Sequence, residues 1–267
     1  MAKMSSAEAQ EFGRQMLQHT LEPYKYIIFV LIGVLILFTF TKFPDCKPVV
    51  AKITGSKKVP NLFHTLKYLA GLKDFRKGIA AEFLYVGMQV TVWSFTIRLA
   101  LDLNPEINER MASNFMVISF VFFFIGKFVA NFLISRFNSA KVLVVYSIIG
   151  AATLAYVSFV PNMTAVYGAV AVSMLFGPCW ATIYAETLET VKEKQYTELA
   201  GAILVMSIVG AAVVPAIQGF VSDLFGSMQL SFLIPMACFI FVGFHFYGKL
   251  KQNAQVQDEV ELLEKAQ

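Results

Sequence analysis

Residues 78–101 read GIAAEFLYVGMQVTVWSFTIRLAL. Only two side chains in this stretch are charged, Glu82 and Arg98, and each lies about one helical turn from an end. The hydrocarbon core of a bilayer is about 30 Å thick, and a helix needs roughly 20 mostly apolar residues to cross it. The stretch therefore predicts a transmembrane helix, and Glu82 and Arg98 are interpreted as anchors near its ends.

Six further stretches have the same apolar character: 24–41, 111–135, 141–160, 164–189, 199–220 and 230–249. Over all 267 residues, 57% are hydrophobic and 15% are charged, whereas soluble domains average about 45–50% and about 25%. These values exclude a secreted disulfide scaffold, a disordered chain and an ordinary soluble enzyme. A net charge of +4 is also too small for a nucleic-acid binder. We expect an all-α membrane protein with seven spans, whose first partner is the lipid bilayer.

Lysine and arginine are distributed unevenly between the connections. The side that holds residues 42–77 and the C-terminal tail carries sixteen of them, and the opposite side carries four. Because cytoplasmic connections are enriched in Lys and Arg, the C-terminus is predicted to be cytoplasmic and the N-terminal segment 1–23 external. The chain is thus expected to be a multi-pass protein of the plasma membrane, which is the inner membrane in bacteria.

The basic connection 42–77 is predicted to be a cytoplasmic linker. Within residues 60–77, apolar side chains are interspersed with basic ones. The apolar residues are Leu62, Phe63, Leu66 and Leu69, and the basic residues are Lys67, Lys73, Arg76 and Lys77. This pattern is typical of an amphipathic helix that lies on the inner leaflet, although a plain inter-domain linker is the alternative. The polar tail 250–267 is predicted to be a solvated helix.

Polar side chains inside a bilayer are costly and must face protein, water or a substrate. Within 78–101, helical spacing places Tyr85, Gln89, Trp93 and Thr96 on one face. An aromatic plate beside amide groups is what a sugar pocket needs. The alternative interpretation is an ordinary contact between helices.

The span 164–189 is interrupted by Gly177-Pro178, and Trp180, Tyr184 and Glu186 follow the interruption. Such breaks are tolerated where they line a cavity, but a break can also simply kink a helix. The two tryptophans of the chain both lie inside spans beside polar residues, whereas interfacial anchors lie at span ends. Their placement favours a pocket.

The span 111–135 contains Asn114, Lys127 and Asn131. Lys127 either snorkels, with its ammonium group directed toward the cytoplasmic interface, or pairs with a carboxylate such as Glu186, or contacts the substrate. The candidate substrate-binding residues are therefore Gln89, Trp93, Trp180, Tyr184 and Asn114. The candidate coupling or gating residues are Lys127, Asn131 and Glu186.

No grouping typical of catalysis is found in the sequence. His19, His64 and His245 are far apart, and the metalloprotease, nucleophile-elbow and phosphate-loop patterns are missing. Cys46, Cys179 and Cys238 are scattered and predict neither a disulfide framework nor a metal site. We expect no enzymatic activity and no cofactor.

The six spans from residue 78 onward fall into two sets of three, and the first member of each set has an interior tryptophan. This is the pattern expected of the inverted repeats in one half of a major facilitator transporter. Ordered motifs extend the likeness: EFLYVGMQ at 82–89 with WSFTIR at 93–98, FFIGKF at 123–128 with LISRF at 133–137, VMSIVG at 205–210, and GFVSD at 219–223. They resemble spans seven, eight and eleven of the L-fucose permease family, the fucose–galactose–glucose proton symporters.

The resemblance implies a specific architecture and partner. Residues 24–41 are similar to span six of that family's twelve spans, 42–77 to its central linker, and 78–249 to its C-terminal six-helix half. The family's proton-binding carboxylates belong to spans one and four, which this chain does not match. The chain is thus expected to be a truncated or separately encoded half that requires the missing N-terminal half, or self-association, to carry sugar and proton.

The resemblance also implies roles for individual residues. In the family, aromatic residues of spans seven and ten contact the sugar, and they match Trp93 and, in place of a tyrosine, Trp180. Gln89 lies next to them and is expected to bond sugar hydroxyls, while Lys127 stands where the family usually has arginine.

Two other classes are compatible with seven spans. A receptor or photoreceptor is one, but a retinal protein needs a lysine in the middle of its last span, and 230–249 has none before Lys249. A non-transporting half-transporter that binds other membrane proteins is the second.

Overall fold

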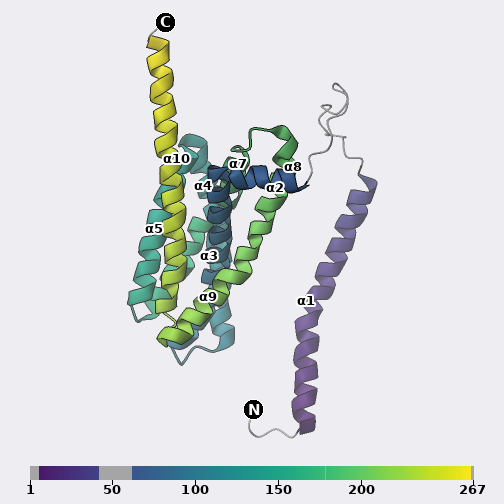
Figure 1. The fold of residues 1–267 in the computed structure, drawn as a ribbon. Helices are drawn as coiled ribbons and strands as arrows, with labels where there is room; N and C mark the ends of the chain where they lie inside the picture. The colour runs from purple at the N-terminus through teal and green to yellow at the C-terminus, as the bar shows by residue number, and fades with distance from the viewer. Residues whose placement is uncertain (1–5, 42–61, 178, 266–267) are drawn as a thin grey trace. The chain divides into compact units, whose positions relative to one another are not determined.

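The computed structural model describes residues 6–41, 62–177 and 179–265, which contain helices and no strand. The chain divides into two compact units at Lys58 and Val59. The first unit holds the helix α1, Ser6–Phe40 (purple in Figure 1). Its apolar part, Tyr24–Phe40, is shorter than the other spans, and the helix continues through 6–23, the segment predicted to lie outside the membrane.

The second unit is a helical bundle (Figure 1). Its elements in chain order are α2 (Leu62–Gly71), α3 (Lys73–Leu103), α4 (Glu109–Arg136), α5 (Ser139–Phe159), α6 (Met163–Val172), η2 (Ser173–Phe176), α7 (Cys179–Leu188), η3 (Lys194–Tyr196), α8 (Thr197–Met206), η4 (Ser207–Val209), α9 (Gly210–Phe225), η5 (Leu230–Phe232) and α10 (Leu233–Lys265). Within the described residues, six helical runs are long and apolar enough to cross a membrane. They match the six spans predicted from residue 78 onward.

Three asparagines begin successive helices of the bundle. The side-chain oxygens of Asn108, Asn138 and Asn162 accept hydrogen bonds from the backbone N–H of Met111, Ala140 and Thr164, each at 2.9 Å. The first N–H groups of a helix have no partner within it, and such caps satisfy them. Short capped connections therefore make α3, α4, α5 and the span of α6, η2 and α7 run alternately up and down.

Helix α3 is the centre of the bundle and packs against α4, α7, α9 and α10. An aromatic cluster joins three of its elements: Phe176 of η2 stacks on Phe239 of α10 with ring centroids 5.6 Å apart and meets the ring of Tyr85 edge-on. Large apolar side chains such as Phe124, Phe128 and Phe244 remain exposed on the outer surface. Exposed apolar surface of this extent is typical of contact with lipid or with another membrane-embedded partner.

The region predicted as one amphipathic helix, 60–77, differs in the structure. Helix α2 ends at Gly71, and the basic residues from Lys73 onward form the first turn of α3. The apolar residues also divide, because Leu62 and Phe63 are exposed whereas Leu69 is buried. Residues 42–61 of the predicted linker, with Cys46, lie outside the described residues. The predicted tail helix is continuous with the last span, since α10 extends to Lys265.

Candidate functional site

The span formed by α6, η2 and α7 is broken where the sequence predicted it. The α-helix tightens into a 3₁₀ turn at Ser173–Phe176, and Gly177 then leaves helical geometry with φ −46° and ψ −93°. Helix α4 approaches the break closely: a Cβ atom on Gly177 would lie 2.6 Å from the carbonyl oxygen of Gly126, and a Cβ on Gly126 would collide with the carbonyl of Met174. Glycine at both positions lets the two backbones touch.

Trp93 of α3 lies beside this break. Its indole Nε1 donates a hydrogen bond of 3.1 Å to Ser173 Oγ, and its ring meets that of Phe123 on α4 edge-on, with centroids 5.2 Å apart. The ammonium group of Lys127 lies 4.5 Å from the centroid of the same Phe123 ring. The structure thus brings two predicted site residues, Trp93 and Lys127, into contact with one phenylalanine ring.

A second aromatic pair follows the break. Trp180 stacks on Tyr184 one turn further along α7, with ring centroids 5.4 Å apart and an interplanar angle of 22°. Both side chains are half-buried. The hydroxyl of Tyr184 lies against α8, 2.8 Å from where a Cβ on Gly201 would be, so this ring is held in place from the far side.

Gln89, Lys127 and Trp180 lie at a similar depth in the bundle. They are 14, 18 and 17 residues from Leu103, Glu109 and Met163, the ends of α3, α4 and α6 on one side. At about 1.5 Å per residue, these separations correspond to depths of about 21, 27 and 26 Å. Gln89 is half-buried, and its amide makes no hydrogen bond within the described residues.

Tyr85 and Thr96 were predicted on the same face as Gln89 and Trp93, but their side chains do not line the partly open surface around those two residues. Both are buried; the Tyr85 hydroxyl donates to the carbonyl of Phe176 at 2.5 Å, and the Thr96 hydroxyl to that of Val92 at 2.6 Å. Because α3 is packed against several helices, most of its polar stripe is covered. Only the edge that carries Gln89 and Trp93 remains partly open.

Asn114 and Asn131 are exposed on α4 and make no side-chain hydrogen bond within the described part of the chain. Counted from Glu109 in the same way, Asn114 lies about 8 Å deep and Asn131 about 33 Å deep. The structure therefore does not bring Asn114 to the depth of the other predicted substrate residues.

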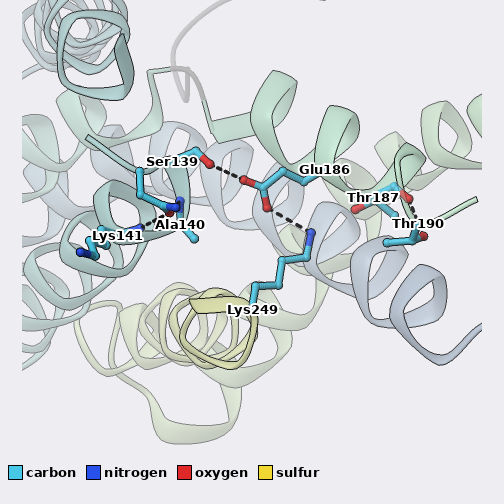
Figure 2. Close-up of polar contacts among 8 residues, drawn as sticks. Ser139, Ala140, Lys141, Glu186, Thr187, Thr190 and Lys249 are labelled. Carbon is cyan, nitrogen blue, oxygen red and sulfur yellow. Dashed lines mark hydrogen bonds and ion pairs between the residues drawn. The ribbon is translucent and has the colours of Figure 1, made fainter. Parts of the chain in front are cut away.

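Glu186 of α7 joins three helices (Figure 2). Ser139 Oγ of α5 donates to its Oε1 at 2.6 Å, and Lys249 Nζ of α10 lies 3.1 Å from its Oε2. A cavity of about 430 Å³ adjoins this cluster and is lined by polar residues, among them Asp74, Glu189 and Thr190. The suggested pair of Glu186 with Lys127 is wrong, because Lys249 occupies that position.

Glu82 is the residue whose setting the sequence interpretation missed. It was expected to be an anchor near a span end, but its side chain is fully buried, and neither carboxyl oxygen has a hydrogen-bond partner within the described residues. Arg98, by contrast, is exposed and lies over the ring of Phe95. The available signal was the small residues Gly78 and Ala81 beside Glu82, which indicate close packing on that face.

Known proteins resemble this chain over most of its length. Residues 78–265 match the family described as the Major Facilitator Superfamily. The chain is 29% identical to the L-fucose-proton symporter of Escherichia coli over 253 residues, which are 94% of this chain and 57% of that protein. It is 24% identical to a putative glucose/galactose transporter of Helicobacter pylori over 230 residues, 85% of this chain and 53% of that protein.

A solved structure shows the same likeness. A crystal structure of the Escherichia coli fucose:proton symporter superposes with a TM-score of 0.75 at 29% identity, covering 92% of this chain and 59% of that one. The chain thus spans somewhat more than half the length of the relatives that it matches, a coverage consistent with one half of such a protein.

Proposed function

The chain belongs to the Major Facilitator Superfamily, and from this premise we propose that it acts as one half of a sugar–proton symporter of the fucose, galactose and glucose type. The relatives named above are symporters or transporters of these sugars. They favour a transporter over a receptor-like seven-span protein. Membership of this family makes the chain a multi-pass protein of the lipid bilayer.

The observation that carries the proposal is the broken span with aromatic residues on each side of the break. Trp93 lies against Ser173 before the break, and Trp180 and Tyr184 stack immediately after it. Aromatic rings bind the apolar face of a sugar, and a nearby amide such as Gln89 bonds its hydroxyls. Broken helices near the bilayer midplane are where facilitator-type transporters bind their substrates.

In this proposal the sugar binds between this half and a second half, on the same polypeptide or another one. Lys127, about one helical turn beyond Phe123, whose ring Trp93 contacts, is placed to meet the substrate or to respond to it. Asn131 lies one turn further along α4, and Glu186 gates the bundle end through its links to Ser139 and Lys249. Asn114 contacts a different part of the sugar path, nearer the opposite end.

The proposed orientation follows the distribution of Lys and Arg. The linker 42–77 and the C-terminus are cytoplasmic, the N-terminus is external, and the membrane is the bacterial inner membrane. The end of the bundle that carries α2 and the Glu186 cluster is then the cytoplasmic end.

Sugar binding and uptake by the full chain test the proposal together. In lipid nanodiscs, equilibrium dialysis should detect binding of labelled L-fucose, D-galactose or D-glucose, and mannitol should not compete. Proteoliposomes that hold the chain without a second half should show no uptake driven by a proton gradient. Uptake by the chain alone would contradict the proposal of a half, and failure to bind any of the three sugars would contradict the assignment of sugar-binding residues to this half.

A further inference from the structure

Glu82 is a carboxyl group inside the bundle that the proposed sugar site does not use. Its exposed fraction is 0%, and both of its oxygens lack a hydrogen-bond partner within the described residues. A lone carboxylate in an apolar interior is strongly disfavoured unless it is paired or neutralised. The group must therefore carry a proton in this arrangement or find partners in another one.

The contacts of the neighbouring turns place Glu82 on the face of α3 that packs against the broken span. Gly78, one turn before it, is so close to Thr187 of α7 that a Cβ there would collide with the threonine side chain. Tyr85, nearly one turn after it, donates to the carbonyl of Phe176 at the break. Helical side chains lean toward the N-terminus of their helix, so Glu82 is directed toward the turn of Gly78.

The Thr187 hydroxyl is buried there and also lacks a partner within the described residues. Thr187 of α7 thus contacts the turn of α3 toward which the Glu82 side chain is directed. A small shift between α3 and α7, or an entering water, would let Glu82 and Thr187 share hydrogen bonds.

Ionisable groups on the elements packed against α3 do not neutralise Glu82. They include His64, Lys67 and Tyr68 on α2, Glu109, Arg110, Lys127 and Arg136 on α4, Tyr167 on α6, Tyr184 and Glu186 on α7, Glu198 on α8, Asp223 on α9, and His245, Tyr247, Lys249 and Lys251 on α10, besides Lys73, Asp74, Arg76, Lys77, Tyr85, Arg98 and Asp102 on α3 itself. None of them forms an ion pair or hydrogen bond with the Glu82 oxygens. Lys249 and Ser139 are the partners of Glu186, so neither of them neutralises Glu82.

We propose that Glu82 is a proton-binding site of this half, occupied when α3 and α7 are packed as in this structure and released to water when the broken span moves. On release, the O–H bond of the carboxylic acid breaks, a water molecule accepts the proton, and the carboxylate keeps the electron pair. Gly177, where helical geometry ends, is the point about which α7 separates from α3. The role of this proton in sugar symport rests on the proposed function, whereas its binding to Glu82 does not.

Infrared spectroscopy of the full chain in lipid nanodiscs tests the proposal, because the carbonyl stretch of a protonated carboxyl is resolved from that of a carboxylate. At neutral pH we expect a protonated-carboxyl band that disappears in Glu82→Gln and persists in Glu198→Gln, a matched change at an exposed glutamate of α8. The band should decrease as the pH is raised. If Glu82→Gln does not fold, labelling the glutamates of the unchanged chain with carbon-13 must shift the band.

Three results would overturn the proposal: no such band at neutral pH, a band that survives Glu82→Gln, or a band that does not respond to pH while the protein stays folded. Addition of L-fucose, D-galactose or D-glucose separates this proposal from the previous one. A titrating Glu82 band that none of these sugars affects supports the proton site and contradicts its coupling to sugar.

Discussion

Tyr85 and Glu82 lie on neighbouring turns of α3 and are both fully buried, but of the two only Tyr85 has a hydrogen-bond partner among the described residues. The hydroxyl of Tyr85 donates to the carbonyl of Phe176, at the point where the broken span has lost its regular helical bonds. A buried polar group that is satisfied adds little net stability, whereas one left unpaired is costly. The Tyr85 hydroxyl thus prevents the carbonyl of Phe176 from being left unpaired at the break. The free-energy cost of burying Glu82 depends on whether its carboxyl group is protonated.

The replacement Tyr85→Phe isolates the hydroxyl of this tyrosine. It leaves the Phe176 carbonyl without this donor and should lower the free energy of unfolding by about 1–3 kcal/mol. Urea unfolding in mixed micelles, followed by tryptophan fluorescence, measures this change. Tyr247→Phe is the matched control, since Tyr247 is 61% exposed, and it should change the free energy by less than about 0.5 kcal/mol. Equal effects of the two variants would contradict the role of Tyr85.

Between elements, the contact of α4 with the break depends on the absence of a side chain. A methyl group at Gly126 would clash with the backbone of Met174. Backbone atoms cannot relieve the clash by a change of rotamer, as a side chain can. Gly126→Ala should destabilise the bundle by about 1–3 kcal/mol, seen as a lower midpoint of thermal unfolding.

Gly248→Ala is the control for the glycine replacement, because a Cβ there has no neighbour within 4 Å. It should leave the midpoint unchanged or slightly raised, as alanine favours a helix more than glycine does. A stable Gly126→Ala protein with unchanged sugar binding would show that α4 and the break are not locked together.

Glu186 of α7 and Lys249 of α10 form an ion pair, and their side chains are 20% and 17% exposed, respectively. A double-mutant cycle with Glu186→Gln and Lys249→Gln should give a coupling energy of about 1 kcal/mol. The same cycle with Lys251, an exposed neighbour, should give none. Equal coupling for the two lysines would indicate a general charge effect instead of a specific pair.

The elements themselves were largely predictable from the sequence. Apolar length located six spans, since a span in lipid has to be a continuous apolar helix, and Gly177-Pro178 located the break. The pairing of Glu186 with Lys249 was not predictable, because the two residues are 63 positions apart and meet only through helix packing. The burial of Glu82 depends in the same way on how closely α7 approaches Gly78.

The candidate site was predictable only in part. Trp93, Lys127 and Trp180 were singled out, and the structure places Trp93 beside the break, Lys127 against the same phenylalanine as Trp93, and Trp180 just after the break. Helical spacing alone grouped Tyr85 and Thr96 with them, because the period of a helix does not show which part of a polar stripe its neighbours cover. The substrate role of these residues remains a prediction.

For the whole molecule, the bundle is one six-span unit of a facilitator, and its orientation determines which end opens to which side. In a cysteine-free background, Glu106→Cys should react with a membrane-impermeant maleimide added outside intact cells, because it lies in the connection between α3 and α4. Glu193→Cys, equally exposed but in the connection before η3, should react only after the membrane is permeabilised. The reverse pattern would invert the proposed topology.

The central claim is that the surface around the break binds sugar, and the two tryptophans allow it to be tested directly. Trp93→Phe leaves Trp180 as the only indole, and Trp180→Phe leaves Trp93. Fluorescence of each variant should change saturably with L-fucose, D-galactose or D-glucose, and should not change with mannitol, because the proposed site places both rings against the bound sugar. If neither emission responds to any of the three sugars, the break does not form a sugar site.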